Sequence, residues 1–123
     1  MIKVMVVDDD APLREMLSKY LSRQGYLVSC AANGPEALAW VEQAGLPHLI
    51  LMDVNMPGMN GLEVLQQLKE KDNKIKVIMM SGSGIPGIRG QAQALGAVAF
   101  LPKPFPFQQL KECIEQIGNS VEL

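Results

Sequence analysis

Short apolar runs and helical patterns of apolar residues alternate five times along the chain. The runs are rich in aliphatic and β-branched residues and predict strands over residues 2–7, 27–31, 48–52, 75–80 and 98–101. Apolar residues spaced three and four positions apart follow each run and predict a helix. Because the strands are almost continuously apolar, they are expected to be covered on both faces, which is typical of a parallel sheet in an α/β protein.

Polar residues and glycines mark where the predicted helices begin and end. Asp10 and Asn60 are expected N-caps, Pro12 lies in a first helical turn, and Gly25 and Gly45 end two helices. The inward faces are predicted to consist of Leu13, Met16, Leu17, Tyr20 and Leu21; Ala37, Leu38, Val41 and Ala44; Leu62, Leu65 and Leu68; and Phe107, Leu110, Ile114 and Ile117. The fourth helix is expected to start late or fray, because Gly82, Gly84, Pro86, Gly87 and Gly90 weaken it.

Length and charge narrow the class of protein. The 123 residues suit one domain, with no internal boundary between residues 1 and 123. A formal net charge of −2 gives no basic field for nucleic acid. The longest apolar runs are far too short to cross a bilayer, and the first residues lack the pattern of a signal peptide, so a cytoplasmic protein is expected. Cys30, Cys113 and Trp40 are interpreted as packing residues, the cysteines buried and reduced.

Aspartates gather at the carboxyl ends of two predicted strands. The chain has five, at positions 8, 9, 10, 53 and 72, and four of them directly follow the first and third apolar runs. In an open parallel sheet ligands bind outside the carboxyl ends of the strands, which brings Asp8, Asp9 and Asp53 to one cleft. Carboxylates this close repel one another unless a cation joins them, and Mg²⁺ prefers such oxygen ligands. The sequence therefore predicts a magnesium site.

Two further side chains follow the fourth and fifth runs. Ser81 offers a hydroxyl that can bind an oxyanion, and Lys103 offers an ammonium group that can pair with one. Three acids, a hydroxyl and a lysine suit phosphoryl transfer to a carboxylate, in which the protein mainly positions the reactants and offsets negative charge.

The same segments carry a family resemblance. VVDDD at 6–10, LMDVNMPGMNG at 51–61, MMSGSG at 79–84 and LPKPF at 101–105 closely resemble the receiver domain of two-component response regulators, and the resemblance covers essentially the whole chain. It implies a CheY-like, flavodoxin-like (βα)₅ fold, doubly wound, with strand order 2-1-3-4-5. It also implies that Asp53 accepts the phosphoryl group and that Asp8, Asp9, Asp53 and the backbone carbonyl of Asn55 bind Mg²⁺.

The resemblance assigns the remaining roles as well. Ser81 and Lys103 would contact the phosphoryl oxygens, Ser81 would move on phosphorylation, and Phe100 would be the switch aromatic, without the hydroxyl of the tyrosine variant. The bond between Lys103 and Pro104 is expected to be cis. Asn55 and Ser83 occupy positions that influence the lifetime of the phosphorylated state in this family.

The resemblance also implies partners. The donor would be a sensor histidine kinase or a phosphotransfer protein. The output would leave through the fourth helix, fifth strand and fifth helix, toward a downstream protein, an output domain or a second copy of the chain. Arg89 is the single charged residue between Val77 and Pro102, and such a charge-poor surface is typical of a contact face. Ile85 and Ile88 could instead point into the core. A stand-alone regulator and a segment of a longer protein both fit these residues.

Two other classes fit less well. A haloacid-dehalogenase-type phosphatase would need an acid where this chain has Asn55, and a flavodoxin-like flavin module would need a loop rich in Ser, Thr and Gly where this chain has three aspartates. The protein is thus predicted to be a phosphoacceptor switch, able to catalyse its own phosphorylation and dephosphorylation, rather than an enzyme acting on a separate substrate. His48 has no partner at metal-ligand spacing and is interpreted as a strand-entry residue.

Overall fold

The computed structural model describes residues 2–82 and 86–120, without the side chains of residues 119 and 120. Within these residues five strands and five helices alternate in the order β1 (Lys3–Val7), α1 (Ala11–Arg23), β2 (Leu27–Ala31), α2 (Gly34–Ala44), β3 (Leu49–Asp53), α3 (Gly61–Lys71), β4 (Lys76–Ser81), α4 (Ile88–Ala94), β5 (Ala99–Pro102) and α5 (Phe107–Ser120). The strands form one parallel sheet in the order β2-β1-β3-β4-β5. The predicted flavodoxin-like α/β fold is confirmed.

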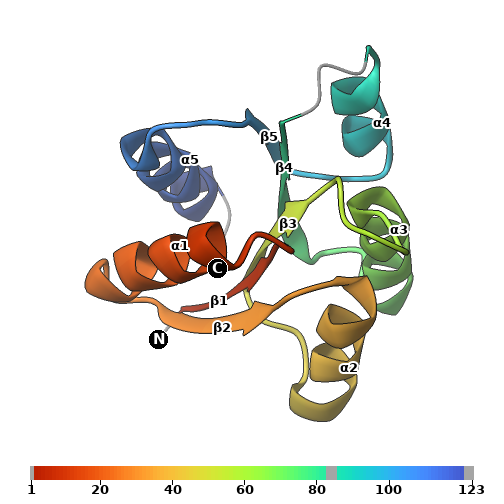
Figure 1. Ribbon diagram of the computed structural model, residues 1–123, viewed down its shortest axis with the longest axis horizontal. Helices are drawn as coiled ribbons and strands as arrows, with labels where there is room; N and C mark the ends of the chain where they lie inside the picture. The colour runs from red at the N-terminus through yellow and green to blue at the C-terminus, as the bar shows by residue number, and fades with distance from the viewer. Residues whose placement is uncertain (1, 83–85, 121–123) are drawn as a thin grey trace.

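Helices cover both faces of the sheet, α1 and α5 on one and α2, α3 and α4 on the other (Figure 1). Alternate residues of each central strand point to opposite layers: Val4 and Val6 join the core under α1 and α5, whereas Met5 and Val7 join the core under α2 and α3. All four are buried. This two-sided burial is the physical reason that the strands are continuously apolar rather than alternating.

The expected caps are confirmed. The Asp10 carboxylate accepts a hydrogen bond from the backbone N–H of Leu13 at 3.1 Å, and Pro12 lies in the first turn of α1. At α3, Asn60 and Glu63 form a reciprocal capping box, each side chain accepting from the other's backbone N–H. These bonds satisfy donors that every helix leaves unpaired at its start, and they fix where each helix leaves the carboxyl edge of the sheet.

Three strands are displaced by one residue from their predicted positions. β3 runs to Asp53, β4 to Ser81 and β5 to Pro102, one position later than their apolar runs indicate. The predictions followed side-chain polarity, but the ladder is made by the backbone: Asp53 still pairs with Met80 across β3 and β4, and the N–H of Val54 donates to the carbonyl of Met80 at 2.8 Å. Two predicted site residues are therefore part of the sheet itself, which holds them more rigidly than a loop would.

Some side chains expected to be buried are exposed. Met16 and Trp40 keep 54% and 43% of their surface, and Ala44 is exposed. Met16 borders open space between the starts of α1 and α5, and Trp40 and Ala44 border open space between α2 and β2. Cys30 and Cys113 are free thiols, as predicted, but only partly buried.

The fourth helix begins late, at Ile88, as predicted from its glycines. Ile88 packs against the core under α2, α3 and α4, whereas Ser83 and Ile85 lie outside the described residues. The peptide bond between Lys103 and Pro104 is cis, as the resemblance implied. Among the described residues, no helix combines the length and the apolar character that a bilayer crossing needs.

Candidate functional site

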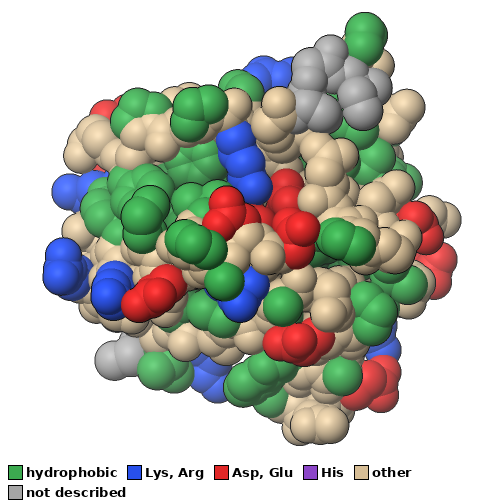
Figure 2. All heavy atoms as spheres, viewed as in Figure 1, with side chains coloured by type: hydrophobic (Ala, Val, Ile, Leu, Met, Phe, Trp, Pro, Cys, Tyr) green, Lys and Arg blue, Asp and Glu red, His purple; other side chains and the backbone are tan. Residues whose placement is uncertain are grey.

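The sequence-predicted site residues converge at the carboxyl edge of the sheet. Asp8 directly follows β1, Asp53 ends β3, Ser81 ends β4 and Lys103 directly follows β5. Figure 2 shows acidic side chains gathered at the centre of this face, with basic side chains beside them. Four strands thus contribute to one cleft at the point where the strand order reverses, which is where open α/β sheets bind ligands.

Three carboxylates in the cleft form a set of oxygen ligands. One oxygen each from Asp8, Asp9 and Asp53 lies within 4.8 Å of the others. Asp8 and Asp53 are buried, whereas Asp9 is exposed and makes no hydrogen bond or ion pair with any residue that the structure describes. A hard divalent cation such as Mg²⁺ takes carboxylate and carbonyl oxygens together with water, so this donor set fits the predicted metal.

Lys103 holds two of the acids. Its Nζ lies 2.6 Å from Asp8 Oδ2 and 3.2 Å from Asp53 Oδ1. Burial lowers the pKa of Lys103, but the hydrogen bond to Asp8 and the charge of Asp53 outweigh it, so that the pKa is raised from its usual value. The lysine therefore stays cationic and offsets part of the charge that the carboxylates concentrate here.

The Asp53 carboxyl has a pKa above its ordinary value. Burial at the end of β3 and the charge of neighbouring Asp8 raise its pKa to about 6, against the opposing effects of Lys103 and of a hydrogen bond from the Asn55 backbone. The ionised form of Asp53 is therefore destabilised when Lys103 is the only cation beside it. A divalent cation would stabilise the ionised form and so lower the pKa of Asp53.

Ser81 lies across from these acids and is almost completely buried, with 2% of its surface exposed. Its Oγ accepts a hydrogen bond from the Asn55 side-chain amide at 3.3 Å. Asn55 itself is exposed at the rim. Because β4 pairs with β3 on the side opposite β1, Ser81 lies next to the end of β3, and its hydroxyl and the Asn55 amide offer two polar groups there.

Asp8 is fixed by its own loop and by a residue that the sequence analysis did not identify. Its Oδ1 accepts from the backbone N–H of Asp10 at 3.0 Å. Its backbone carbonyl accepts from Arg14 Nη1 at 2.7 Å. Arg14 is the first basic residue of α1, six positions after Asp8, and its helical position was the signal that could have identified it.

Phe100 lies on β5, half-buried, and packs against the core under α2, α3 and α4. The Arg89 guanidinium of α4 sits 5.3 Å from the centroid of its ring, a cation–π contact. Phe100 pairs with Met79 on β4, two positions before Ser81. The predicted switch pair is therefore on neighbouring strands.

A groove of about 490 Å³ opens beside the cleft, between the start of α1 and the start of α5. Most of its lining is apolar, and Lys103 of the cleft is part of it. The lining residues are Asp10, Leu13, Met16, Gly82, Lys103, Pro104, Phe105 and Phe107. The exposed Met16 belongs to this groove.

The arrangement suits group transfer to a carboxylate. Asp53 offers a nucleophilic oxygen, Lys103 and Ser81 offer a cation and a hydroxyl for the oxyanions of an incoming group, and the acids can hold a cation that offsets its charge.

Comparisons with known proteins agree with this geometry. The family model for the response regulator receiver domain matches residues 4–115. The chain is 33% identical over 114 residues to sporulation initiation phosphotransferase F of Bacillus subtilis, covering 93% of this chain and 91% of that protein. It is 40% identical over 103 residues to transcriptional regulatory protein ResD of the same organism, covering 84% of this chain but only 42% of ResD.

Solved structures show the same fold. The chemotaxis protein CheY4 of Vibrio cholerae superposes with a TM-score of 0.87 at 34% identity, over 95% of this chain and 98% of that one. The response regulator TrrA of Thermotoga maritima, solved in complex with Mg²⁺ and BeF, superposes with a TM-score of 0.85 at 32% identity, over 95% and 99% of the two chains.

Proposed function

The chain belongs to the family of response regulator receiver domains, and from this premise we propose that it accepts a phosphoryl group on Asp53 in a Mg²⁺-dependent reaction and thereby switches a protein-interaction surface. The observation that carries the proposal is the convergence of Asp53 with Asp8, Asp9, Ser81 and Lys103 at one edge of the sheet. We also propose that residues 1–123 form a single receiver domain.

The proposed transfer is a displacement at phosphorus. A carboxylate oxygen of Asp53 attacks, its bond to phosphorus forms, and the bond between phosphorus and the donor's leaving atom breaks, the electron pair departing with the donor. Lys103 and Ser81 bind the equatorial oxygens, over which the charge of the phosphoryl group is spread in the transition state. Asp8, Asp9, Asp53 and the backbone carbonyl of Asn55 would hold Mg²⁺, which supplies charge neutralisation for the incoming phosphoryl group.

The proposed donor is a histidine kinase or a phosphotransfer protein. The groove between α1 and α5 supports this, because it places the apolar side chains Leu13, Met16 and Phe105 directly beside Lys103. A donor protein can bury these side chains while its phosphorylated residue enters the cleft. The chain then acts as a phosphoacceptor switch rather than as an enzyme on a separate substrate, and it contributes the catalytic groups for its own phosphorylation and dephosphorylation.

The phosphatase alternative receives no support from the geometry. The position that would need an acid is occupied by Asn55, whose amide already donates to Ser81. A flavin phosphate is likewise disfavoured by the acids after β1.

The proposed output begins at Ser81 and Phe100. Movement of Ser81 toward a phosphoryl oxygen would open space next to β5, and Phe100 would move into it. Because Arg89 stacks on Phe100, a change at the ring is transmitted to α4. The surface formed by α4, β5 and α5 is therefore the proposed contact face for a target protein, an output domain or a second copy of the chain.

The first test is phosphorylation by a small acyl phosphate with Mg²⁺. Intact-mass measurement is expected to show one added phosphoryl group on the wild-type chain and none on Asp53→Asn. Asp10→Asn is the matched control, because Asp10 caps α1 and asparagine caps equally well, so this variant should still gain the mass. An unchanged mass gain in Asp53→Asn would remove Asp53 as the acceptor.

The second test locates the output face. Hydrogen exchange with and without beryllofluoride, a phosphoryl mimic, is expected to change protection in α4, β5 and the first turn of α5. Ser81→Ala should bind the mimic but lose the change in protection at Phe100. Changes restricted to α1 and α2 would place the output surface elsewhere.

A further inference from the structure

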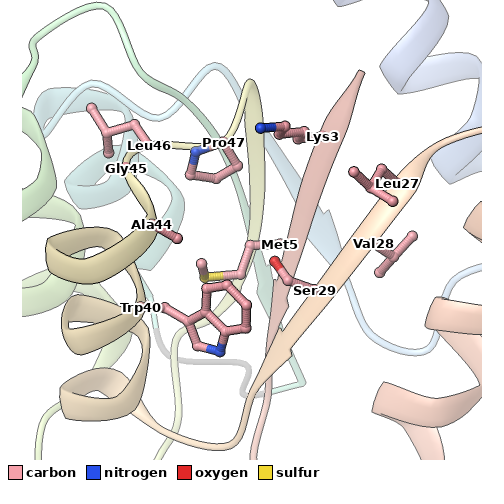
Figure 3. Close-up of a pocket in the computed structure, with 10 residues that line it drawn as sticks. All are labelled: Lys3, Met5, Leu27, Val28, Ser29, Trp40, Ala44, Gly45, Leu46 and Pro47. Carbon is pink, nitrogen blue, oxygen red and sulfur yellow. The ribbon is translucent and has the colours of Figure 1, made fainter. Parts of the chain in front are cut away.

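A second groove lies at the opposite, amino-terminal edge of the sheet, between β2 and α2. It encloses about 300 Å³, at the small end of the range for ligand pockets. Its residues come from the starts of β1 and β2, from the last turns of α2 and from the segment before β3: Lys3, Met5, Leu27, Val28, Ser29, Trp40, Ala44, Gly45, Leu46 and Pro47 (Figure 3). It shares no residue with the acid cleft, which lies at the carboxyl ends of the strands.

The groove exposes large apolar side chains. Four large hydrophobic residues are exposed among those that the structure describes, and Leu27 at 52% and Trp40 at 43% are two of them. Figure 3 shows the Trp40 indole reaching from α2 toward Met5 on the sheet. The space remains open because α2 ends in small residues: Ala44 is exposed, and a Cβ placed on Gly45 would meet no atom within 4 Å. An apolar molecule would remove this surface from water.

One cation stands at the mouth of the groove. The Lys3 side chain extends from β1 toward Pro47 (Figure 3), and among the described residues no carboxylate lies within ion-pair distance of it. Its backbone is held in place, because the N–H of Lys3 donates to His48 Nδ1 at 2.9 Å. One ammonium group beside apolar side chains such as Leu27 and Trp40 complements a ligand with an apolar body and one negative charge.

The charge of that ligand is limited by α2. The carboxyl end of a helix carries partial negative charge, and the carboxyl end of α2 forms one wall of the groove. A dianionic phosphate would be repelled by this wall, and the groove offers no helix N-terminus to hold it. A monoanionic carboxylate carries half that charge, so this wall repels it less while it pairs with Lys3.

We propose that the groove between β2 and α2 binds a small amphiphilic carboxylate, such as a medium-chain fatty acid or an arylalkanoic acid. The apolar body lies against Leu27, Trp40 and Leu46, and the carboxylate pairs with the Lys3 ammonium. This binding does not depend on Asp53 and would be a property of the domain separate from phosphoryl transfer.

The chain offers a direct probe, because Trp40 is its single tryptophan and lines the groove. Octanoate is titrated into the full chain below its micellar concentration, and Trp40 emission is expected to shift to shorter wavelength and saturate. Octanol has the same chain without the charge, and butyrate has the charge without the chain. Both should bind at least about tenfold more weakly than octanoate.

Two variants separate the contributions. Lys3→Met keeps an unbranched side chain but removes the charge, so octanoate and octanol should bind equally weakly. Ala44→Leu fills the groove and should abolish saturation. Lys19→Met on α1, an exposed lysine outside the groove, is the matched control and should bind octanoate like the wild type. Asp53 phosphorylation by an acyl phosphate should be unchanged in Lys3→Met, so a failure here is distinguishable from a failure of the proposed function.

Three results would overturn the proposal. The first is the absence of a saturable change in Trp40 emission with octanoate. The second is equal affinity for octanoate in the wild type and Lys3→Met. The third is a dimer in sedimentation experiments whose formation is lost in Leu27→Asp and which octanoate does not dissociate, because a second copy of the chain would then cover the groove.

Discussion

Gly61, at the start of α3, lies against the backbone of Asp53: a Cβ on Gly61 would come within 2.1 Å of the Asp53 carbonyl oxygen and 2.9 Å of its carbonyl carbon. The N–H of Gly61 also donates to the Val54 carbonyl at 2.8 Å. The first turn of α3 therefore packs directly on the end of β3, and Asp53 is held between the sheet and the helix that follows it.

This contact predicts a large effect of a single methyl group. Gly61→Ala should lower the free energy of unfolding by about 1–3 kcal/mol, because neither backbone segment can move away without breaking the capping box or the β3–β4 ladder. Urea denaturation measures the change. Gly90→Ala on α4 is the control: a Cβ there meets no atom within 4 Å, and alanine is the better helix former, so stability should be unchanged or raised. Equal effects of the two substitutions would contradict the close packing at Asp53.

The raised pKa of Asp53 predicts a pH dependence in metal-free protein. The pKa is about 6 in the folded chain and 3.8 for an unperturbed aspartate, so the folded state binds a proton more tightly than the unfolded state. The contribution is fully present below about pH 4 and is lost as the pH rises through about 6. In EDTA, the free energy of unfolding of the wild type minus that of Asp53→Asn should fall as the pH rises from about 4 to about 6. A difference that stays flat or rises with pH would contradict the burial of an unneutralised carboxylate.

Mg²⁺ should restore the stability that the metal-free protein loses when Asp53 ionises. Mg²⁺ that binds only the folded chain at ten times its dissociation constant adds about 1.4 kcal/mol to the free energy of unfolding. Thermal unfolding with and without Mg²⁺ should show the gain for the wild type and for Asp10→Asn, and little gain for Asp9→Ala, which lacks the exposed carboxylate of the set. The same upward shift in Asp9→Ala would place the metal elsewhere.

Arg14 is predicted to hold the loop that carries the first two acids. Arg14→Ala removes the donor to the Asp8 carbonyl and should cost about 1 kcal/mol of stability, together with weaker Mg²⁺ binding. Arg14→Lys should restore part of both, because a lysine can still donate to the carbonyl. Arg23→Ala, at the exposed end of the same helix, should change neither. Mg²⁺ titration followed by NMR at Asp8 and Asp9 distinguishes this positioning effect from simple loss of helix stability.

Side-chain polarity was sufficient to predict the layers of the fold and the edge of the sheet where Asp8, Asp9, Asp53, Ser81 and Lys103 meet. It could not show that Asp53 and Ser81 end their strands, because strand pairing depends on backbone hydrogen bonds that continue past the last apolar residue. Nor could it show that Arg14 binds a main-chain carbonyl or that Gly61 touches Asp53. Those contacts depend on distances between elements, which a single sequence does not record.

Helix periodicity had a similar limit. The spacing of apolar residues placed Met16 and Ala44 on inward faces, yet both are exposed, and Trp40 was expected to pack. A periodic pattern gives the direction in which a side chain leaves its helix, but whether that side is covered depends on the length and position of neighbouring elements. Met16 lines the groove between α1 and α5, and Trp40 and Ala44 line the groove between β2 and α2, so both grooves lie where this covering is incomplete.

The strand order has a consequence for synthesis of the protein. Of the five strands, β1 is made first, but it lies inside the sheet, with β2 on one side and β3 on the other. In a nascent chain this apolar strand therefore stays unpaired on at least one edge until both neighbours have been synthesised. The ion pair between Lys103 and Asp8 joins residues 95 positions apart. The acid cleft is therefore completed only after residue 103 has been synthesised, and a chain released before that residue would carry Asp8 and Asp53 without the lysine that pairs with them.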